Sequence, residues 1–209
     1  MVGSMAADTA TFSSEPINPQ ACAIRSDSDS LLTTGDRTRL LEGEILLASE
    51  THDLWNAAVT ARIYLPLKRE AAWGQITDYS RWVQYFPDIT HSEVLLDRSD
   101  RGWKRLYQAA SKNFLLFNAQ VDIHLKVFEN RLSDYKSQIQ FRMERGSFDN
   151  FSADLYLEDY REGTLLTYQV KATPNIPVPA LFIQQAIRMD LPINLEQMRR
   201  ILKQSLAIA

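Results

Sequence analysis

The segment Phe117–Val127 alternates apolar and polar side chains without a break, and this pattern constrains the fold more than any other feature. Its apolar positions are Phe117, Ala119, Val121, Ile123, Leu125 and Val127. Because successive side chains of a strand point to opposite faces, the segment has one apolar and one polar face. Extended, it would span about 36 Å, roughly twice the usual strand length. Such a strand belongs in an antiparallel sheet that is covered on one side.

Other parts of the chain repeat the same alternation. Residues 54–65 form an earlier one-sided strand, and residues 93–109 predict a hairpin around a turn at 97–102. Segments 135–143, 151–157 and 164–172 alternate again, the last two separated by a turn at 159–163. The pattern predicts a meander of long strands that share one apolar face.

Two stretches have helical periodicity instead. Between residues 73 and 86 the apolar side chains recur at spacings of three and four, and Asp78 or Ser80 can cap a break into two short helices. Residues 178–206 predict a long helix whose apolar side chains fall within an arc of about 120°. Pro192 lies inside that helix and should kink or interrupt it, with a bend at 189–191. The expected fold is α+β, with a long antiparallel sheet wrapped around a C-terminal helix.

The composition excludes several kinds of chemistry. The 7 glycines never form the close pairs of a phosphate-binding loop. The 3 histidines and the single Cys22 are scattered, so no metal site and no thiol nucleophile is predicted. We therefore expect neither a metal nor a cofactor.

Charge separates the chain into two parts. Residues 1–53 hold 9 acidic and 3 basic side chains, whereas the remainder has a net charge of +3. We expect an acidic, flexible N-terminal arm at 1–50, within which 40–48 can form a short helix or strand, and one folded domain at 54–206. A body this weakly basic predicts no nucleic-acid partner but allows transient contact with a membrane surface. No apolar run approaches ~20 residues, which favours a soluble, cytoplasmic protein. The oligomeric state stays open.

Residues 71–89, Ala-Ala-Trp-Gly-Gln-Ile-Thr-Asp-Tyr-Ser-Arg-Trp-Val-Gln-Tyr-Phe-Pro-Asp-Ile, carry a family resemblance together with Asp190-Leu191-Pro192. They are similar to the START-like, helix-grip (SRPBCC) superfamily, and within it to the polyketide cyclase/dehydrase and coenzyme Q-binding branch. The resemblance covers about residues 54–206. It implies an apolar cavity between the sheet and the last helix, where members bind lipids, quinones, sterols or polyketides.

The candidate ligand-binding residues combine the apolar faces of the strands with the apolar arc of the helix. They are Tyr107, Phe117, Val121, Phe141, Tyr168, Ile183, Ile187, Asp190, Leu191, Asn194 and Met198. Tyr168 shares a strand face with Leu166 and Val170 and is the best candidate for an inward-facing tyrosine. Asp190 and Asn194 flank Pro192 and can serve either its freed carbonyl or a ligand head group.

Several residues have a plainer interpretation. Asp122 and His124 share a strand face, but it is the polar one, and we expect it to be solvated. His91 can lie on a pocket rim or simply at the surface. Phe182, Ala186, Met189 and Ile193 form a second apolar strip on the last helix, which can meet a membrane, a lid loop or a partner, or be buried beneath the N-terminal segment.

The resemblance, together with these residues, implies three alternative functions. The first is binding or carriage of a hydrophobic small molecule such as a lipid or an isoprenoid quinone. The second is a cyclase/dehydratase-type enzyme, in which an inward tyrosine and an acid such as Asp190 transfer protons on a polyketide-like substrate. The third is an interaction module without a ligand. The sequence offers no confident catalytic residue.

Overall fold

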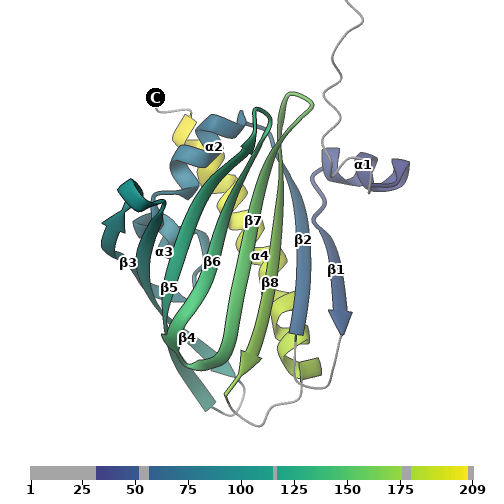
Figure 1. Ribbon diagram of the computed structural model, residues 1–209. Coiled ribbons are helices and arrows are strands. Elements are labelled where there is room, and N and C mark those ends of the chain that lie inside the picture. Colours follow the sequence, from purple (N-terminus) through teal and green to yellow (C-terminus); the bar gives the residue numbers. More distant parts are fainter. Residues whose placement is uncertain (1–31, 52–56, 115–116, 176–179, 207–209) are drawn as a thin grey trace, which may run out of the picture.

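The computed structural model describes residues 32–51, 57–114, 117–175 and 180–206. Its strands form one antiparallel sheet in the order β1-β2-β8-β7-β6-β5-β4-β3 (Figure 1). The strands are β1 Leu46–Thr51, β2 Ala57–Leu65, β3 Ile89–Arg98, β4 Trp103–Phe114, β5 Phe117–Ser133, β6 Lys136–Gly146, β7 Phe148–Tyr160 and β8 Gly163–Pro174. The helices are α1 Thr34–Leu41, α2 Arg69–Ile76, α3 Trp82–Tyr85 and α4 Ala180–Leu206, with short 3₁₀ turns η2 Tyr79–Arg81 and η3 Ser99–Arg101.

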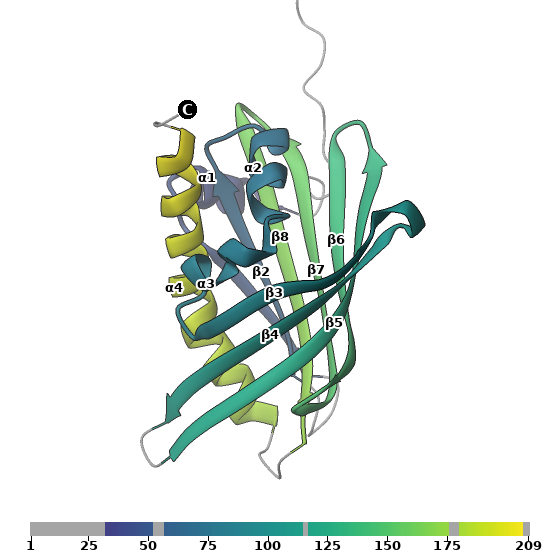
Figure 2. The ribbon, with the colours of Figure 1, turned by 90° about the vertical axis from the view of Figure 1, so that its left-hand side faces the viewer.

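The sheet curves around α4, as Figure 2 shows from the side. The long helix lies along the concave face and packs chiefly against β2 and α3. Helices α2 and α3 follow the first long strand, as expected, and lie over the same face. The predicted α+β helix-grip architecture is confirmed.

The register of the strands places the alternating apolar residues on one face. Val59 of β2 lies opposite Val170 of β8, which lies opposite Ala153 of β7. Ala153 in turn pairs with Phe141 of β6, and Phe141 with Val127 of β5. Because paired residues point the same way, this row crosses five strands on the concave face, and every member is buried. The one-sided meander expected from the sequence is present.

Helix α4 runs through Pro192 without a break. Leu195, Met198 and Leu202 are fully buried on the side that faces the sheet. The expected interruption is therefore absent, although in Figure 2 the N-terminal turns of the helix slope toward the sheet. A proline removes one hydrogen bond from a helix, but a helix held by packing on both sides of the proline can stay continuous.

A buried arginine joins α2 to strands β6 and β7. The Arg69 guanidinium donates hydrogen bonds to Ser137 Oγ at 2.8 Å, to the Asp134 carbonyl oxygen at 2.7 Å and to Asp159 Oδ1 at 3.2 Å. These acceptors lie in or beside β6 and β7. The side chain of Arg69 is nearly inaccessible, and its charge is compensated by Asp159 and by Glu70.

Residues 32–51 belong to the fold, although they fall in the segment predicted to be an arm. Both alternatives for residues 40–48 occur in part, because α1 ends at Leu41 and β1 begins at Leu46. Leu40 and Leu46 pack with Leu32, Tyr160 and Leu165 in a small apolar cluster of their own. Residues 1–31 lie outside the described part of the chain.

Strand β3 forms one free edge of the sheet. Its pairing with β4 has two register irregularities, between Ile89 and His91 and between Val94 and Leu96. Val94, Leu95 and Leu96 are exposed.

Gly163 lies where the β7–β8 turn touches the end of β2. A Cβ atom added at this glycine would overlap the carbonyl oxygen of Leu65 and lie 2.8 Å from the Tyr64 hydroxyl oxygen. Gly74 of α2 has no atom within 4 Å of the corresponding position. The sheet therefore requires a glycine at 163 but not at 74.

We predict that Gly163→Ala lowers the free energy of unfolding by ~1–3 kcal/mol, because backbone must move to admit the methyl group. Gly74→Ala should raise it by about 0.5–1 kcal/mol, because alanine favours an exposed helix interior. Denaturant unfolding of both variants measures this. Equal effects from the two substitutions would contradict the close approach at Gly163.

Candidate functional site

The interior between the sheet and the helices is lined by a cluster of aromatic rings. The Trp82 ring stacks on Phe86 at 5.3 Å between centroids and meets the Phe141 ring edge-on at 5.1 Å. Phe86 lies 6.3 Å from Tyr168 of β8, and Tyr79 lies 6.1 Å from Phe141. The Trp82 indole N–H donates to the carbonyl oxygen of Ile76 at 2.9 Å, which fixes α3 beside α2. The cluster joins the short helices to the middle of the sheet.

Packing differs between the two ends of this interior. Toward the β5–β6 and β7–β8 turns, Ile139, Leu157 and Leu166 are completely buried. Toward the opposite end, the apolar side chains of Met143, Phe148, Phe151 and Ile187 remain half-buried although they pack against the core. The side chains named at the first end are therefore enclosed, whereas those at the second end, called the looser end below, keep exposed apolar surface.

Tyr168 lies between these two regions, with 7% of its surface exposed. Burial raises the pKa of its hydroxyl above the usual value of a tyrosine. Unlike Tyr79 and Tyr85, it makes no hydrogen bond within the described part of the structure. The predicted inward orientation of Tyr168 agrees with its position.

A polar network lies on the concave face near the filled end. The Tyr79 hydroxyl and the Lys104 ammonium both donate to Glu129 Oε1, each at 2.8 Å. Lys104 also lies 5.7 Å from the centre of the Tyr79 ring. Burial, and then the charge and hydrogen bond of Glu129, raise the pKa of Tyr79. A recess of about 120 Å³ opens beside Lys104 and Glu129.

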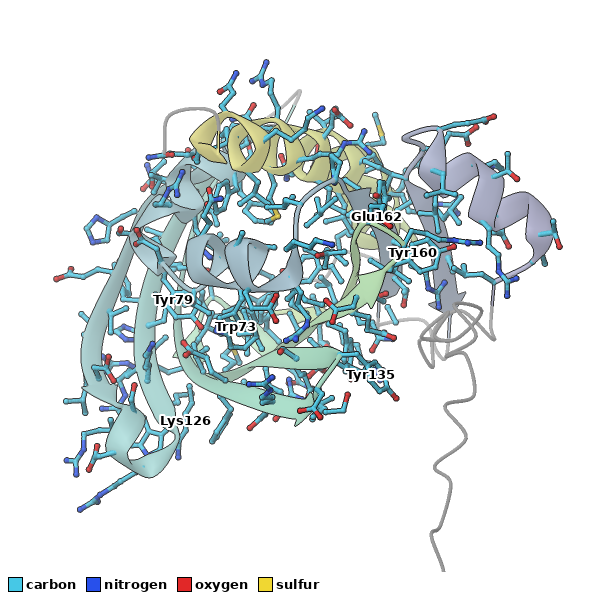
Figure 3. All side chains as sticks on the ribbon, turned by 90° about the horizontal axis from the view of Figure 1, so that it is seen from above. Trp73, Tyr79, Lys126, Tyr135, Tyr160 and Glu162 are labelled. Atoms are coloured by element: carbon cyan, nitrogen blue, oxygen red, sulfur yellow. The ribbon has the colours of Figure 1, made fainter. Side chains whose placement is uncertain are left out.

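This network was not predicted from the sequence, although one signal pointed to it. Glu129 continues the apolar face of Phe117–Val127 by one further step of two residues, so the alternation itself predicts an inward carboxylate. Figure 3 shows Tyr79 within the curve of the sheet and Lys126 outside it. The inward orientation of Lys104 on β4 and of Tyr79 on η2 could not be recognised without knowing the strand register.

The structure places five of the eleven predicted site residues in or against the core. Phe141, Leu191 and Met198 are buried in the core together with Tyr168, and Ile187 packs against them. Val121 lies at the looser end, while Asp190 and Asn194 are half-buried on α4. The side chains of Phe117 and Ile183 lie outside the described part of the structure.

Tyr107 lies on the other face of the sheet, contrary to the prediction. It pairs with His124 across β4 and β5, and its ring lies between those of His124 at 4.9 Å and His91 at 5.7 Å. The inward positions of β4 are instead occupied by Lys104, Leu106 and Gln108. Asp122 and His124 lie on this outer face, as expected, and Asp122 is exposed.

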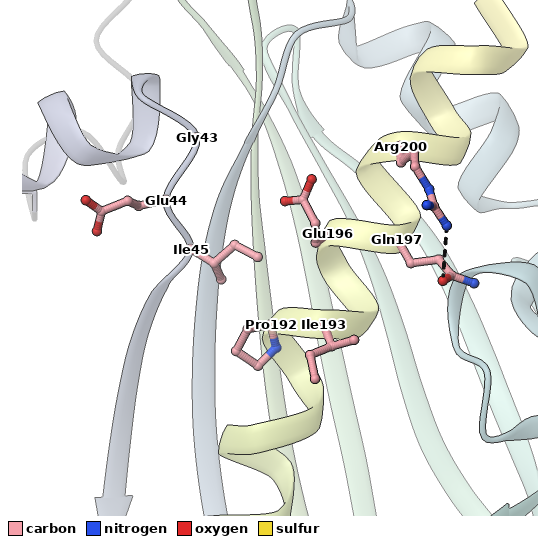
Figure 4. A pocket seen from close by; sticks show the side chains of 8 residues that line it. All are labelled: Gly43, Glu44, Ile45, Pro192, Ile193, Glu196, Gln197 and Arg200. Atoms are coloured by element: carbon pink, nitrogen blue, oxygen red, sulfur yellow. Dashed lines mark hydrogen bonds between the residues drawn. The ribbon is translucent and has the colours of Figure 1, made fainter.

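A groove of about 710 Å³ lies outside the interior, between α4 and the link from α1 to β1 (Figure 4). It is lined by Gly43, Glu44, Ile45, Pro192, Ile193, Glu196, Gln197 and Arg200. Two members of the predicted second apolar strip, Met189 and Ile193, are 64% and 65% exposed. This face of α4 is therefore distinct from the face that carries Leu191 and Met198.

The described residues offer neither a cluster of metal ligands nor a helix that could span a membrane. None of their histidine, cysteine and acidic side chains gather in a group of three that could hold a metal ion. None of the described helices is long and apolar enough to cross a membrane.

Residues 65–199 match the profile of the family described as polyketide cyclase / dehydrase and lipid transport, and the chain belongs to that family. No curated protein sequence matches the chain.

Solved structures share the fold at low sequence identity. A STAR-related lipid transfer protein from Xanthomonas axonopodis is 15% identical, with a TM-score of 0.64 over 76% of this chain and 93% of that one. Human StAR-related lipid transfer protein 5 is 10% identical, with a TM-score of 0.60 over 76% and 86%. The Zhui aromatase/cyclase from Streptomyces sp. R1128 is 10% identical, with a TM-score of 0.57 over 72% and 96%. The fold is thus shared with both lipid-transfer proteins and a cyclase.

The buried tyrosines generate a pH prediction. The pKa values of Tyr79, Tyr85 and Tyr168 are raised, so folding favours their neutral forms. The stability gained from keeping these three hydroxyls neutral is fully present below about pH 10, the pKa of a tyrosine in the unfolded chain. It is lost as the pH rises from there toward the higher pKa of the folded state. Tyrosinate absorbance followed with circular dichroism should show these three hydroxyls titrating only as the protein unfolds. Titration of all 8 tyrosines together in the folded protein would contradict this burial.

Proposed function

We propose that the protein binds, and can carry, a hydrophobic small molecule such as a lipid or an isoprenoid quinone between the sheet and α4. The apolar surface that stays exposed at the looser end of the interior carries this proposal. Membership of a family that includes lipid transport supports it.

The half-buried apolar side chains converge from three elements. Met143 lies on β6, Phe148 and Phe151 on β7, and Ile187 on α4, all packed against the same core. The Phe148 and Phe151 rings are 5.7 Å apart. Apolar surface of this kind gains roughly 25 cal/mol for each Å² removed from water, and a hydrophobic ligand removes it.

The proposed binding residues follow from this geometry. Ile187 and Leu191 of α4 would contact one side of the ligand, and Phe141 and Tyr168 the other. Met198 would close the filled end. Asp190 and Asn194 lie beside this surface on α4, whereas Tyr107 lies outside it.

We predict that Ile187→Glu weakens binding of a fluorescent fatty acid at least tenfold, because the carboxylate would lose hydration beside the apolar wall. The matched control is Ile193→Glu, on the same helix but 65% exposed, which should bind as the wild type does. Fluorescence titration of the three proteins measures both effects.

Mass spectrometry of an organic extract of the purified wild-type protein gives a second measurement. We expect a co-purifying hydrophobic compound that is depleted in Ile187→Glu and retained in Ile193→Glu. An empty wild-type protein that also fails to bind the fatty acid would refute the proposed function.

A cyclase-type enzyme is the second candidate, and the polar network favours it. General acid–base catalysis needs titratable groups within hydrogen-bond reach, and Tyr79, Glu129 and Lys104 meet that condition. The sequence suggested an inward tyrosine together with Asp190 or another acid of the pocket, and Tyr79 with Glu129 is a pair of this kind. Glu129 can accept a proton, and Lys104 can stabilise developing negative charge on a substrate oxygen.

If this second function holds, Glu129→Gln should lower conversion of a linear poly-β-ketone thioester about 100-fold or more, the lower range for loss of a general base. Glu144→Gln is the control, since Glu144 pairs with Arg105 on the outer face, and it should leave turnover unchanged. Product formation is followed by mass spectrometry. Absence of turnover by the wild type, or equal rates in both variants, would exclude a role for this network in cyclisation.

A further inference from the structure

The groove on the outer side of α4 has an apolar floor. Ile45, Pro192 and Ile193 line it, and they come from two segments far apart in the sequence (Figure 4). Ile193 is 65% exposed, and Met189, one turn earlier on the same helix, is 64% exposed. Adjoining apolar side chains with this much exposed surface indicate a place where another segment or molecule binds.

The acidic side chains of the groove already have basic partners. Glu44 forms an ion pair with Arg39 at 2.8 Å, and Glu196 forms one with Arg199 on the next turn of α4. Their negative charges are therefore compensated within the fold, so they give the groove little attraction for a cation.

The basic side chains at the C-terminal end of the groove have no such partners. Arg200 lines the groove, and its guanidinium contacts Gln197 Oε1 at 3.5 Å. Lys203, one turn further along α4, is exposed. No acidic side chain among the described residues forms an ion pair with either of them. This end of the groove therefore offers two uncompensated positive charges to whatever binds there.

The N-terminal segment joins the fold close to these charges. Leu32 packs in the small apolar cluster that includes α1. Gly43, in the link that follows α1, accepts a hydrogen bond through its carbonyl oxygen from Arg199 at 2.8 Å. Because Arg199 directly precedes Arg200, residues 1–31 are connected to the fold beside the basic end of the groove.

The composition of residues 1–31 complements that end. Their charged residues are Asp8, Glu15, Asp27 and Asp29 against the single Arg25, which gives a net charge of -3. Asp29 and Asp27 are the acids nearest to Leu32 along the chain, and the apolar Ile24 precedes them.

The spacing of these groups also matches the helix. Ile193 lies seven residues before Arg200, which is about 10 Å along α4 at 1.5 Å per residue. Ile24 lies three residues before Asp27, and three residues of extended chain span about 10 Å as well. An acid can therefore reach the basic end while the isoleucine reaches the apolar floor.

We propose that residues 21–31 of the same chain occupy this groove. Ile24 lies on the apolar floor beside Ile193, and the two nearby aspartates, Asp27 and Asp29, lie beside the two uncompensated basic side chains. Because the segment is tethered at Leu32, its effective concentration at the groove is high, so a small contact area is sufficient. The groove lies on the outer side of α4, so this inference does not depend on the proposed binding of a ligand in the interior.

The single Cys22 permits a test in the full-length protein without an introduced cysteine. A nitroxide attached to Cys22 broadens the NMR signals of methyl groups that lie near it. We expect the methyl signals of Ile193 and Ile45 to lose intensity, and to regain it when the nitroxide is reduced. Leu95 is 47% exposed on β3, at the opposite edge of the sheet from β1, and should keep its intensity.

Charge reversal then tests why the segment binds. The double variant Arg200→Glu and Lys203→Glu should abolish the broadening. Adding Asp27→Lys and Asp29→Lys to that variant should restore it, because opposite charges face each other again. Raising the salt concentration should weaken the contact in the wild type. The matched control is Arg131→Glu, an exposed arginine on β5, which should leave the broadening unchanged.

Several results would overturn the inference. Equal intensities at Ile193 and Leu95 in the labelled wild type would show that the segment does not occupy the groove. Unchanged broadening after charge reversal would exclude the ionic contact. Broadening in a mixture of nitroxide-labelled chains and isotope-labelled chains would make a second copy the occupant. Broadening by nitroxide-bearing anionic vesicles, in place of the Cys22 label, would make a membrane surface the occupant.

Discussion

A single helix is too narrow to cover an eight-stranded sheet, and this mismatch governs the structure. Seven spacings of about 4.8 Å make the sheet roughly 34 Å wide, whereas a helix with its side chains is about 10 Å across. Helix α4 packs chiefly against β2 and α3, near one side of the sheet. The sheet curves, and the rings of Trp82, Phe86 and Tyr79 cover part of what α4 leaves. Apolar side chains that neither α4 nor these rings cover, such as Phe148 and Phe151, stay half-buried.

The sequence predicted the elements that depend on local periodicity. Alternation placed Phe141 and Tyr168 on the concave face, and helical periodicity placed Leu191 and Met198 on the inner side of α4. These predictions succeeded because the burial of a whole face fixes the facing of every residue on it. The same reasoning predicted the outer position of Asp122 and His124.

Features that depend on contacts between distant segments could not be predicted in the same way. Tyr107 was placed wrongly because residues 103–109 mix charged and apolar side chains on both faces, and its strand partners decide its orientation. Glu129 has a role only through Tyr79 and Lys104, which reach it from other elements. Pro192 was expected to kink or interrupt the helix, but α4 is continuous from Ala180 to Leu206.

The register irregularities of β3 bear on how the protein behaves at high concentration. A sheet that must stay open to grip a helix keeps two free edges, and a free edge can recruit the edge of another chain. The two irregularities disturb the regular spacing of backbone donors and acceptors along β3, even though Val94, Leu95 and Leu96 are exposed there. A second chain would have to reproduce the same irregularities in order to pair along the full strand. The distortion thus opposes fibrous association along this edge.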